Sequence, residues 1–311
     1  NGLRGQRVAV TGAAGQVGEY LCWALEAAGA DVWRLGHHPG AGIDTAFDLT
    51  SAEAVRKRIV GCRPDVVIHA AAYTDVDGAE RDPNLAMAVN GAGSAHVAAA
   101  AKEVGAWLLG VGTDFVFPGS GGAPYGEDAA PNPINAYGRS KLAGEQAILA
   151  ADPSFAVART AWVYGGPGRH FPRTLLRLLR DRDAVEVVDD ETSCPTYASD
   201  LAEALTALAI ARGAGVFHLV NEGQATRYAL AREVARAAGL DPDVVHATTT
   251  ADFLRKTPLP ARRPPNSALR NERAAALGIR LRPWNEAVAA YVPKLAKEMR
   301  IARAVAASGG E

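Results

Sequence analysis

Residues 7–18 read RVAVTGAAGQVG, a short apolar run that is followed at once by a glycine turn and the start of a helix. Gly12, Gly15 and Gly18 have the spacing G-x-x-G-x-x-G. The first glycine allows a sharp turn, the second lets the backbone approach a pyrophosphate, and the third lets the helix pack closely on the strand. Because free N–H groups at a helix N-terminus attract phosphate, this stretch predicts a dinucleotide-binding turn after the first strand of a parallel sheet.

The first half of the chain alternates short β-branched runs with longer stretches rich in alanine and leucine. We expect strands at residues 7–11, 31–35, 65–70 and 107–111, and helices at residues 16–28, 52–60 and 84–104. Continuously hydrophobic strands are typical of a parallel sheet that helices cover on both faces. Since crossovers in such a sheet are right-handed, the pattern predicts an α/β fold with a doubly wound, parallel, Rossmann-type sheet.

The second half has a looser pattern, with longer loops and a cluster of prolines at residues 258–265. We expect residues 1–165 to form a dinucleotide-binding domain, and residues 166–311 to form mainly a smaller, discontinuous α/β lobe that binds substrate. Residues 216–220, VFHLV, are predicted to be a strand that rejoins the main sheet. The lobe is therefore expected to consist of segments that leave the sheet and return to it.

Composition narrows the function classes. The 311 residues carry 33 Lys and Arg against 34 Asp and Glu, a formal net charge of -1, so there is no basic stripe for nucleic acid. No stretch is apolar for long enough to span a membrane and the first residues lack a signal-peptide pattern, so we expect a cytoplasmic protein. Cys22, Cys62 and Cys194 lie far apart without metal-ligand spacing, which favours small apolar core residues.

The end of the second predicted strand bears on the cofactor. NAD-selective sites usually place a carboxylate there, whereas residues 34–38 read RLGHH. Arg34 and the two histidines could receive a 2′-phosphate, so the sequence favours NADPH. If these residues are only solvated surface groups, NADH remains possible. Asp48 and Leu49, after the next short extended stretch, are candidates to contact the adenine.

Residues 137–141 read YGRSK, which places Tyr137 and Lys141 on one face of a helix, one turn apart. Reduction of a ketone needs a proton on oxygen as hydride reaches carbon. A free tyrosine has a pKa near ~10, and a nearby ammonium eases its proton transfer. The pattern therefore predicts Tyr137 as proton donor and Lys141 as the ammonium, which could also bind the nicotinamide ribose. The same spacing also occurs on many surface helices.

A third group should hold and polarise the carbonyl. Thr113 follows the predicted strand at residues 107–111, and ligands bind at the carboxyl ends of such strands. Thr113 is our candidate for a hydrogen bond to the substrate oxygen, and its alternative role is that of a β-branched strand residue. Asp114 is expected to order the loop rather than to touch substrate.

Taken together, these motifs resemble the extended short-chain dehydrogenase/reductases, and among them the dTDP-4-dehydrorhamnose reductase family. The matching segments occur in order along nearly the whole chain: TGAAGQVG (11–18), PDVVIHAAAYTDVDGAE (64–80), TDFVF (113–117), NAYGRSKLAGE (135–145), RTAWVYG (159–165), FPRTLL (171–176), CPTYASDLA (194–202), FHLVNEG (217–223) and RRPPNSAL (262–269). Their shared order is more specific than any single motif.

The resemblance implies a catalytic trio of Thr113, Tyr137 and Lys141, an NADPH cofactor, and a dTDP-linked 4-keto-6-deoxy-L-hexose that is reduced at C4 to dTDP-L-rhamnose. It places further residues at the cofactor: Gln16, Val17, Ala70, Ala71, Ala72, Tyr73 and Asn90. It also places residues at the substrate: Thr74, Phe115, Trp162 and Asn266. From their own chemistry, Trp162 could equally be a core residue, Asn266 could cap a turn, and Arg159 could be a structural ion-pair donor.

Two positions depart from the family pattern. Phe115 stands where the family often has a tyrosine, which leaves the identity of the hexose open. Some members use a glutamate of the first helix in magnesium-linked dimerisation, but Tyr20 occupies the comparable place beside Glu19, so we expect no metal. The sequence is compatible with a monomer or a homodimer.

Two alternatives remain at this stage. The chain could be a 4-ketoreductase for another dTDP-deoxysugar or for a dihydrostreptose-type pathway. From a different class, it could be a non-catalytic, dinucleotide-binding regulatory subunit, although such relatives can lose the tyrosine or lysine that this chain keeps.

Overall fold

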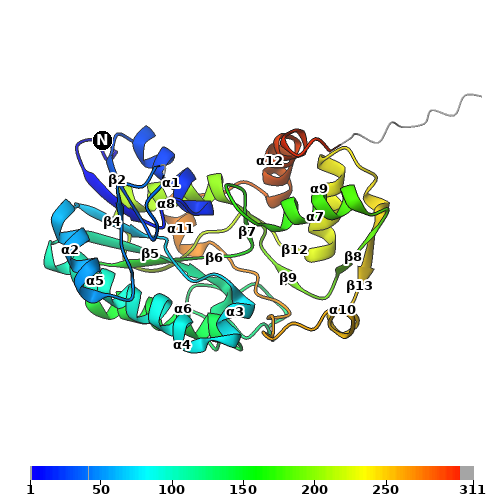
Figure 1. Cartoon of the computed structure of the whole chain (residues 1–311), viewed down its shortest axis with the longest axis horizontal. Coiled ribbons are helices and arrows are strands. Elements are labelled where there is room, and N and C mark those ends of the chain that lie inside the picture. The colour runs from blue at the N-terminus through cyan, green and yellow to red at the C-terminus, as the bar shows by residue number, and fades with distance from the viewer. Residues whose placement is uncertain (1, 41, 302–311) are drawn as a thin grey trace, which may run out of the picture.

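The computed structural model describes residues 2–40 and 42–301. Its centre is a seven-stranded sheet in the order β11-β6-β5-β4-β1-β2-β3, in which every pairing is parallel (Figure 1). The strands are β1 (Arg7–Thr11), β2 (Asp31–Gly36), β3 (Thr45–Ala46), β4 (Val66–His69), β5 (Trp107–Thr113), β6 (Ala156–Thr160) and β11 (Gly215–His218). The predicted doubly wound α/β fold is confirmed.

Helices cover both faces of this sheet. One face packs against α1 (Gln16–Ala27) and α8 (Ala198–Ala211), and the other against α2 (Ala52–Cys62), α5 (Gly93–Glu103) and α6 (Ala136–Ala151) (Figure 1). Val8 and Val10 of β1 belong to the first core and Ala9 to the second, as the alternation of side chains along a strand requires. Burial on both faces explains why the strands are continuously hydrophobic.

Chain order reverses next to β1, because the chain proceeds from β1 to β2 and β3 and then crosses to β4 on the opposite side. Open parallel sheets bind ligands at the carboxyl ends of the strands that flank such a reversal. Three short elements follow β4 at this place: α3 (Val76–Arg81), α4 (Pro83–Ala86) and a π-helical segment, η1 (Met87–Ala92). We expected one continuous helix over residues 84–104, whereas the structure interrupts it with η1 before α5.

The remaining elements form a second body beside the sheet. Its core gathers α7 (Phe171–Asp181), α9 (Arg227–Ala237) and α12 (Trp284–Glu298) against the parallel pair β8 (Val185–Val188) and β13 (Val245–Thr248) (Figure 1). The strand expected at residues 216–220 is β11, which pairs with β6 in the main sheet. The division at residue 165 stays a prediction, and its end beyond residue 301 lies outside the described residues.

Smaller elements connect these layers. They are η2 (Asp114–Val116), β7 (Val163–Tyr164), β9 (Thr192–Ser193), β10 (Thr196–Tyr197), β12 (Ala225–Thr226), η3 (Pro242–Val244), α10 (Thr250–Lys256) and α11 (Glu272–Ala276). β7 pairs with β10 and β9 pairs with β12, so they join the second body to the end of the sheet. None of the helices within residues 2–40 and 42–301 is both long and apolar enough to cross a bilayer.

The glycine turn after β1 depends on close backbone contacts. A side chain at Gly18 would lie 2.7 Å from the Cα of Ala13 and would overlap the carbonyl oxygen of Gly12. We therefore predict that Gly18→Ala lowers the free energy of unfolding by about 1–3 kcal/mol, because neither backbone group can move freely. Chemical denaturation measures this change.

The matched control is Gly61→Ala on the exposed side of α2, where an added methyl group would meet no atom within 4 Å. Alanine favours helix more than glycine does, so this variant should gain roughly 0.5–1 kcal/mol. Equal effects of the two substitutions would contradict the role assigned to the Gly18 contact.

Candidate active site

A cavity of about 700 Å³ opens at the carboxyl ends of the strands, between the sheet and the second body. Its size is that of a pocket for a small organic ligand. It is lined by many of the residues singled out from the sequence: Gly12, Gly15, Gln16, Val17, Gly18, Ala70, Ala71, Ala72, Thr74, Thr113, Phe115, Tyr137, Lys141 and Trp162. The fold thus brings together residues that are far apart in the sequence.

The glycine turn forms one wall of this cavity. Gly12 has a φ of +72°, and a Cβ there would lie 2.7 Å from the backbone nitrogen of Ala71. Only glycine allows the turn to approach the segment after β4 this closely. The helix α1 begins at Gln16 without a side-chain cap at Gly15, so its first N–H groups remain for a phosphate. This arrangement fits a dinucleotide.

A second hollow of about 430 Å³ adjoins the first and shares Gly12, Ala71 and Ala72 with it. Asp48, Leu49 and Tyr73 line this hollow, which is mostly apolar and suits a flat base. The two hollows share part of their lining, so each can take one half of a dinucleotide.

The structure does not support the expected role of Arg34. Its guanidinium pairs with Glu26 of α1 and does not line either hollow. Strand alternation turns Arg34 toward α1, whereas His37 lines both hollows and His38 lines the larger one. The two histidines therefore remain the candidates for contact with a 2′-phosphate.

Asn90 also differs from the expectation of a direct contact, because it lines neither hollow. Its buried amide accepts a hydrogen bond from the Tyr73 nitrogen (2.8 Å) and donates to the Tyr73 oxygen and to Ser140 Oγ (both 3.0 Å). Asn90 sits in the π-helical segment η1, and such segments are frequent at functional sites. It holds the segment after β4 against α6, and so it positions the cavity wall.

The helix α6 carries Tyr137 and Lys141 into the cavity. Asn135 caps this helix by accepting from the Gly138 nitrogen (2.8 Å), and its own amide donates to the Arg262 oxygen (2.8 Å). A side chain at Gly138 would overlap the Phe115 oxygen, so glycine is what allows the start of α6 to approach the end of β5. Thr113 ends that strand and faces the same cavity. The predicted trio is thus brought together.

Electrostatics differ between the members of the trio. Burial raises the pKa of Tyr137 to about 12, the Thr113 hydroxyl lowers it, and the Asp114 carboxylate raises it. Burial lowers the pKa of Lys141 to about 8, while Glu145 raises it. Lys141 Nζ donates to the Val111 oxygen (2.8 Å), which fixes the ammonium at the end of β5.

Glu145 lies one helical turn after Lys141 on α6. It forms a buried, two-point ion pair with Arg159, at 2.9 Å and 2.5 Å. The interpretation of Arg159 as a structural ion-pair donor therefore matches its contacts.

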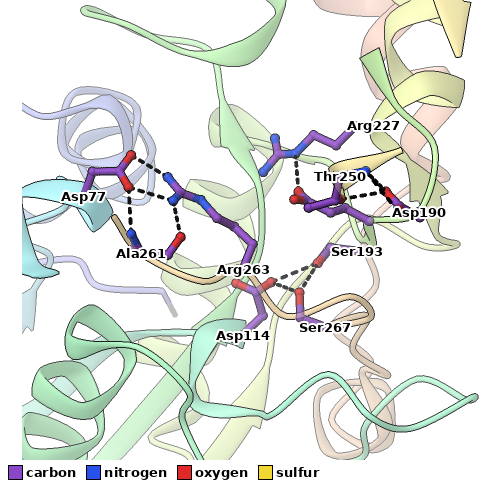
Figure 2. A network of polar contacts seen from close by, with 10 residues as sticks. Asp77, Asp114, Asp190, Ser193, Arg227, Thr250, Ala261, Arg263 and Ser267 are labelled. Carbon is purple, nitrogen blue, oxygen red and sulfur yellow. Dashed lines mark hydrogen bonds and ion pairs between the residues drawn. The ribbon is translucent and has the colours of Figure 1, made fainter. Parts of the chain in front are cut away.

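Asp114 joins the sheet to the second body. Its carboxylate accepts hydrogen bonds from Ser193 (2.9 Å) and from Ser267 (Figure 2), so three separate segments meet there. The neighbouring Thr113 hydroxyl donates a third (3.2 Å). Asp114 is buried and also lines the cavity. Burial raises its pKa to about 6, and the hydroxyl donors lower it. The expectation that Asp114 orders this loop agrees with these contacts.

A second polar link joins α3 to the proline-rich loop. Asp77 of α3 forms two hydrogen bonds with Arg263, at 2.7 Å and 2.6 Å, and accepts a third from the Ala261 nitrogen (3.2 Å) (Figure 2). This link holds the proline-rich loop across α3.

Two predicted substrate residues have different placements. Trp162 lines the cavity, but Asn266 does not. The Asn266 amide donates to the Gly121 oxygen (3.2 Å) and accepts from the Ala268 nitrogen (3.1 Å), so it ties two loops together as a turn cap would. Phe115 meets the Tyr137 ring edge to face, with 5.8 Å between centroids.

The sequence analysis missed Arg227, which begins α9 and lines the cavity from the second body. No motif marked it, because its place in the site arises only when β12 pairs with β9 and brings α9 to the cavity. Across residues 2–40 and 42–301, no cluster of three or more His, Cys, Asp or Glu could hold a metal ion.

The glycine cradle, the paired hollows and the helix with Tyr137 and Lys141 define a dinucleotide-binding protein of the short-chain dehydrogenase/reductase type. The chain belongs to the family described as RmlD substrate binding domain, which matches residues 6–297.

Individual relatives agree with this assignment. A dTDP-4-dehydrorhamnose reductase of Streptomyces griseus is 44% identical over 293 residues, which is 92% of this chain and 93% of the relative. A probable dTDP-4,6-dihydroxy-2-methyloxan-3-one 4-ketoreductase of Streptomyces antibioticus is 39% identical over 289 residues, 92% and 94% of the two chains. The crystal structure of dTDP-4-dehydrorhamnose reductase from Bacillus anthracis str. Ames in complex with NADP has a TM-score of 0.85 at 32% identity, covering 93% of this chain and 99% of that chain.

The raised pKa of Asp114 has a consequence for stability. Because the folded-state pKa is about 6 and the usual value is 3.8, ionisation costs folding free energy as pH rises from about 4 through 6. We predict that Asp114→Asn, which removes this charge, raises the free energy of unfolding at pH 7.5 by on the order of 2 kcal/mol. Thermal unfolding between pH 4 and pH 8 should show the gain growing up to about pH 6 and then staying constant.

Asp152 provides the control, since its pKa is lowered by hydrogen bonds from Ser154. Asp152→Asn should give no gain that grows over the same pH range. A melting temperature of Asp114→Asn equal to or below that of the parent at pH 7.5 would show that the hydrogen bonds outweigh the burial.

Proposed function

We propose that this protein is an NADPH-dependent reductase of the C4 ketone of a dTDP-4-keto-6-deoxy-L-hexose, giving dTDP-L-rhamnose. The convergence of Thr113, Tyr137 and Lys141 in one cavity beside the glycine cradle carries this proposal. The similarity to dTDP-4-dehydrorhamnose reductases over most of the chain supports the choice of substrate. We further propose that residues 166–311 mainly bind the sugar nucleotide, and that the protein works in the cytoplasm as a monomer or a homodimer.

The cofactor fits the residues that are present. The turn keeps its shape only because Gly12 and Gly18 carry no side chain, since a Cβ at either position would meet backbone atoms of the turn or of the segment after β4. In this shape the first N–H groups of α1 are left for a pyrophosphate. When bound, NADPH supplies the hydride that the reduction requires. The cavity lining includes Ala70, Ala71 and Ala72, which offer an apolar surface to a nicotinamide. It also includes His37 and His38, which in this proposal supply hydrogen-bond donors to a 2′-phosphate. NADH remains a possible alternative.

Proton delivery falls to Tyr137. Its phenol has a pKa raised to about 12 in this environment, so it is protonated at neutral pH and can donate from Oη. Lys141, fixed on the Val111 oxygen, stabilises the phenolate that remains. Thr113 can donate a hydrogen bond to the ketone oxygen and so holds it within reach of the phenol.

Another dTDP-deoxysugar is the second candidate substrate. Phe115 offers an aromatic edge where a tyrosine would offer a hydroxyl, and the 4-ketoreductase relative from Streptomyces antibioticus favours the same possibility. A non-catalytic regulatory subunit is the weaker alternative, because both Tyr137 and Lys141 line the cavity. A panel of dTDP-hexuloses, with NADPH oxidation followed by absorbance, distinguishes these possibilities.

We predict that Tyr137→Phe lowers kcat by about 10²–10⁴-fold and leaves the Kd for NADPH within about twofold, because only proton delivery is lost. Single-turnover NADPH oxidation and fluorescence titration measure the two quantities. The control is Tyr125→Phe, which alters a tyrosine stacked on Phe117 outside the cavity and should leave both unchanged. Full activity of Tyr137→Phe would show that the proton comes from another group.

The lowered pKa of Lys141 predicts a pH profile. Since its ammonium is present below a pKa of about 8 and is lost above it, kcat/KM for NADPH should fall as pH rises beyond about 8. Tyr137 stays protonated through this range, so the break belongs to Lys141. Lys141→Arg keeps its charge and should show lower activity without the break. A flat profile to pH 9.5 for the parent protein, or the same break in Lys141→Arg, would rule out this assignment.

A further inference from the structure

The side chain of Arg227 enters the cavity from the first turn of α9. Its guanidinium carbon lies 3.8 Å from the centroid of the Trp162 ring and 5.6 Å from that of Phe171. A guanidinium stacked on an indole in this way is held flat and loses little hydrogen-bonding capacity. Both aromatic residues line the same cavity.

Among the residues that the structure describes, a single ion pair accompanies this stack. Arg227 Nε lies 3.5 Å from a carboxylate oxygen of Glu191, and the contact engages one edge of the guanidinium. The Arg227 backbone nitrogen also donates to the Glu191 oxygen (3.2 Å), which anchors the start of α9. In the part of the chain that the structure describes, neither terminal nitrogen of Arg227 has a hydrogen-bond acceptor. Arg227 lines the cavity, so its two terminal nitrogens remain available there as donors in the plane that the Trp162 stack sets.

This cation is separate from the dinucleotide cradle. The cradle belongs to the turn between β1 and α1, whereas Arg227 comes from the second body and lies near Asp114 and Arg263. A fork of two N–H donors is suited to bind two oxygens of a phosphate group. A second anion-binding group in the same cavity, on a different body, points to a second phosphorylated ligand.

We infer that Arg227, stacked on Trp162 and anchored by Glu191, binds the diphosphate of the sugar nucleotide and makes the protein select nucleoside diphosphates over nucleosides. The inference rests on the proposed function, which supplies a diphosphate-linked sugar. Arg227 acts here as a binding and specificity residue, distant in role from the proton transfer at Tyr137.

The test compares two probes that differ only in the diphosphate. The Kd values of dTDP and of thymidine are measured by calorimetry with saturating NADP⁺, for the parent protein and for Arg227→Met and Arg227→Lys. Arg227→Met should weaken dTDP binding by about tenfold to hundredfold, as expected for charged hydrogen bonds, with thymidine changed by less than about twofold. Arg227→Lys keeps the charge but lacks the planar pair of donors, so its Kd for dTDP should lie between those of the parent protein and Arg227→Met.

Arg232→Met is the matched control, because Arg232 lies on the same helix and pairs with Asp243 away from the cavity. It should leave both Kd values unchanged. Equal weakening of dTDP and thymidine in Arg227→Met would overturn the inference, since Arg227 would then only support the packing of Trp162. Unchanged dTDP binding in Arg227→Met would overturn it as well.

The result of the dTDP-binding test does not depend on whether the protein reduces the sugar nucleotide. If the dTDP-4-keto-6-deoxyhexose is not reduced and dTDP binding still depends on Arg227, the proposed substrate is wrong and the diphosphate site stands. If the sugar nucleotide is reduced and dTDP binding does not depend on Arg227, the proposed function stands and the diphosphate site is wrong.

Discussion

The close approach of helix α6 to the end of strand β5 is the constraint on which the rest of the site depends. It is possible because Gly138 has no side chain to meet the Phe115 oxygen. Through this approach, Tyr137 and Thr113 share one cavity wall, although they belong to different elements. Asn135 then fixes the helix start from two sides, through the Gly138 nitrogen and the Arg262 oxygen. A larger residue at position 138 would meet the Phe115 oxygen and displace the Tyr137 phenol from its place beside Thr113.

A buried carboxylate connects this arrangement to the second body. Asp114 gathers hydroxyl donors from Ser193 and Ser267, which lie on either side of α9 and β13 in the sequence. The burial of this charge is unfavourable, as its raised pKa shows, and the hydroxyls offset only part of the cost. Polar groups that lower stability in this way are typical of functional sites. The cavity thus depends on a junction that a purely apolar contact could have made more stable.

The sequence was sufficient to predict the sheet, the glycine cradle and the trio, because each of them follows from local spacing. Strand β1 and its turn lie next to each other in the chain, and Tyr137 and Lys141 share a helix face whatever the rest of the fold does. Arg34 was expected at the cofactor, whereas its side chain pairs with Glu26 of a neighbouring helix, a contact that its own strand does not reveal. Arg227 was missed for the same reason, since it reaches the cavity only through pairing between distant strands. Long-range contacts of single side chains are not encoded in short motifs.

The buried Glu145–Arg159 pair shows how a structural feature can serve the chemistry. Glu145 lies one helical turn after Lys141, and its negative charge raises the pKa of the buried ammonium, which burial alone would lower further. Arg159 engages Glu145 at two points and so holds this carboxylate in place. Lys141 itself hydrogen-bonds the Val111 oxygen rather than an acid, so its charge is not neutralised by direct contact. The Lys141 ammonium therefore stays charged near neutral pH and available to the Tyr137 phenol, because Arg159 holds the Glu145 carboxylate away from direct contact with it.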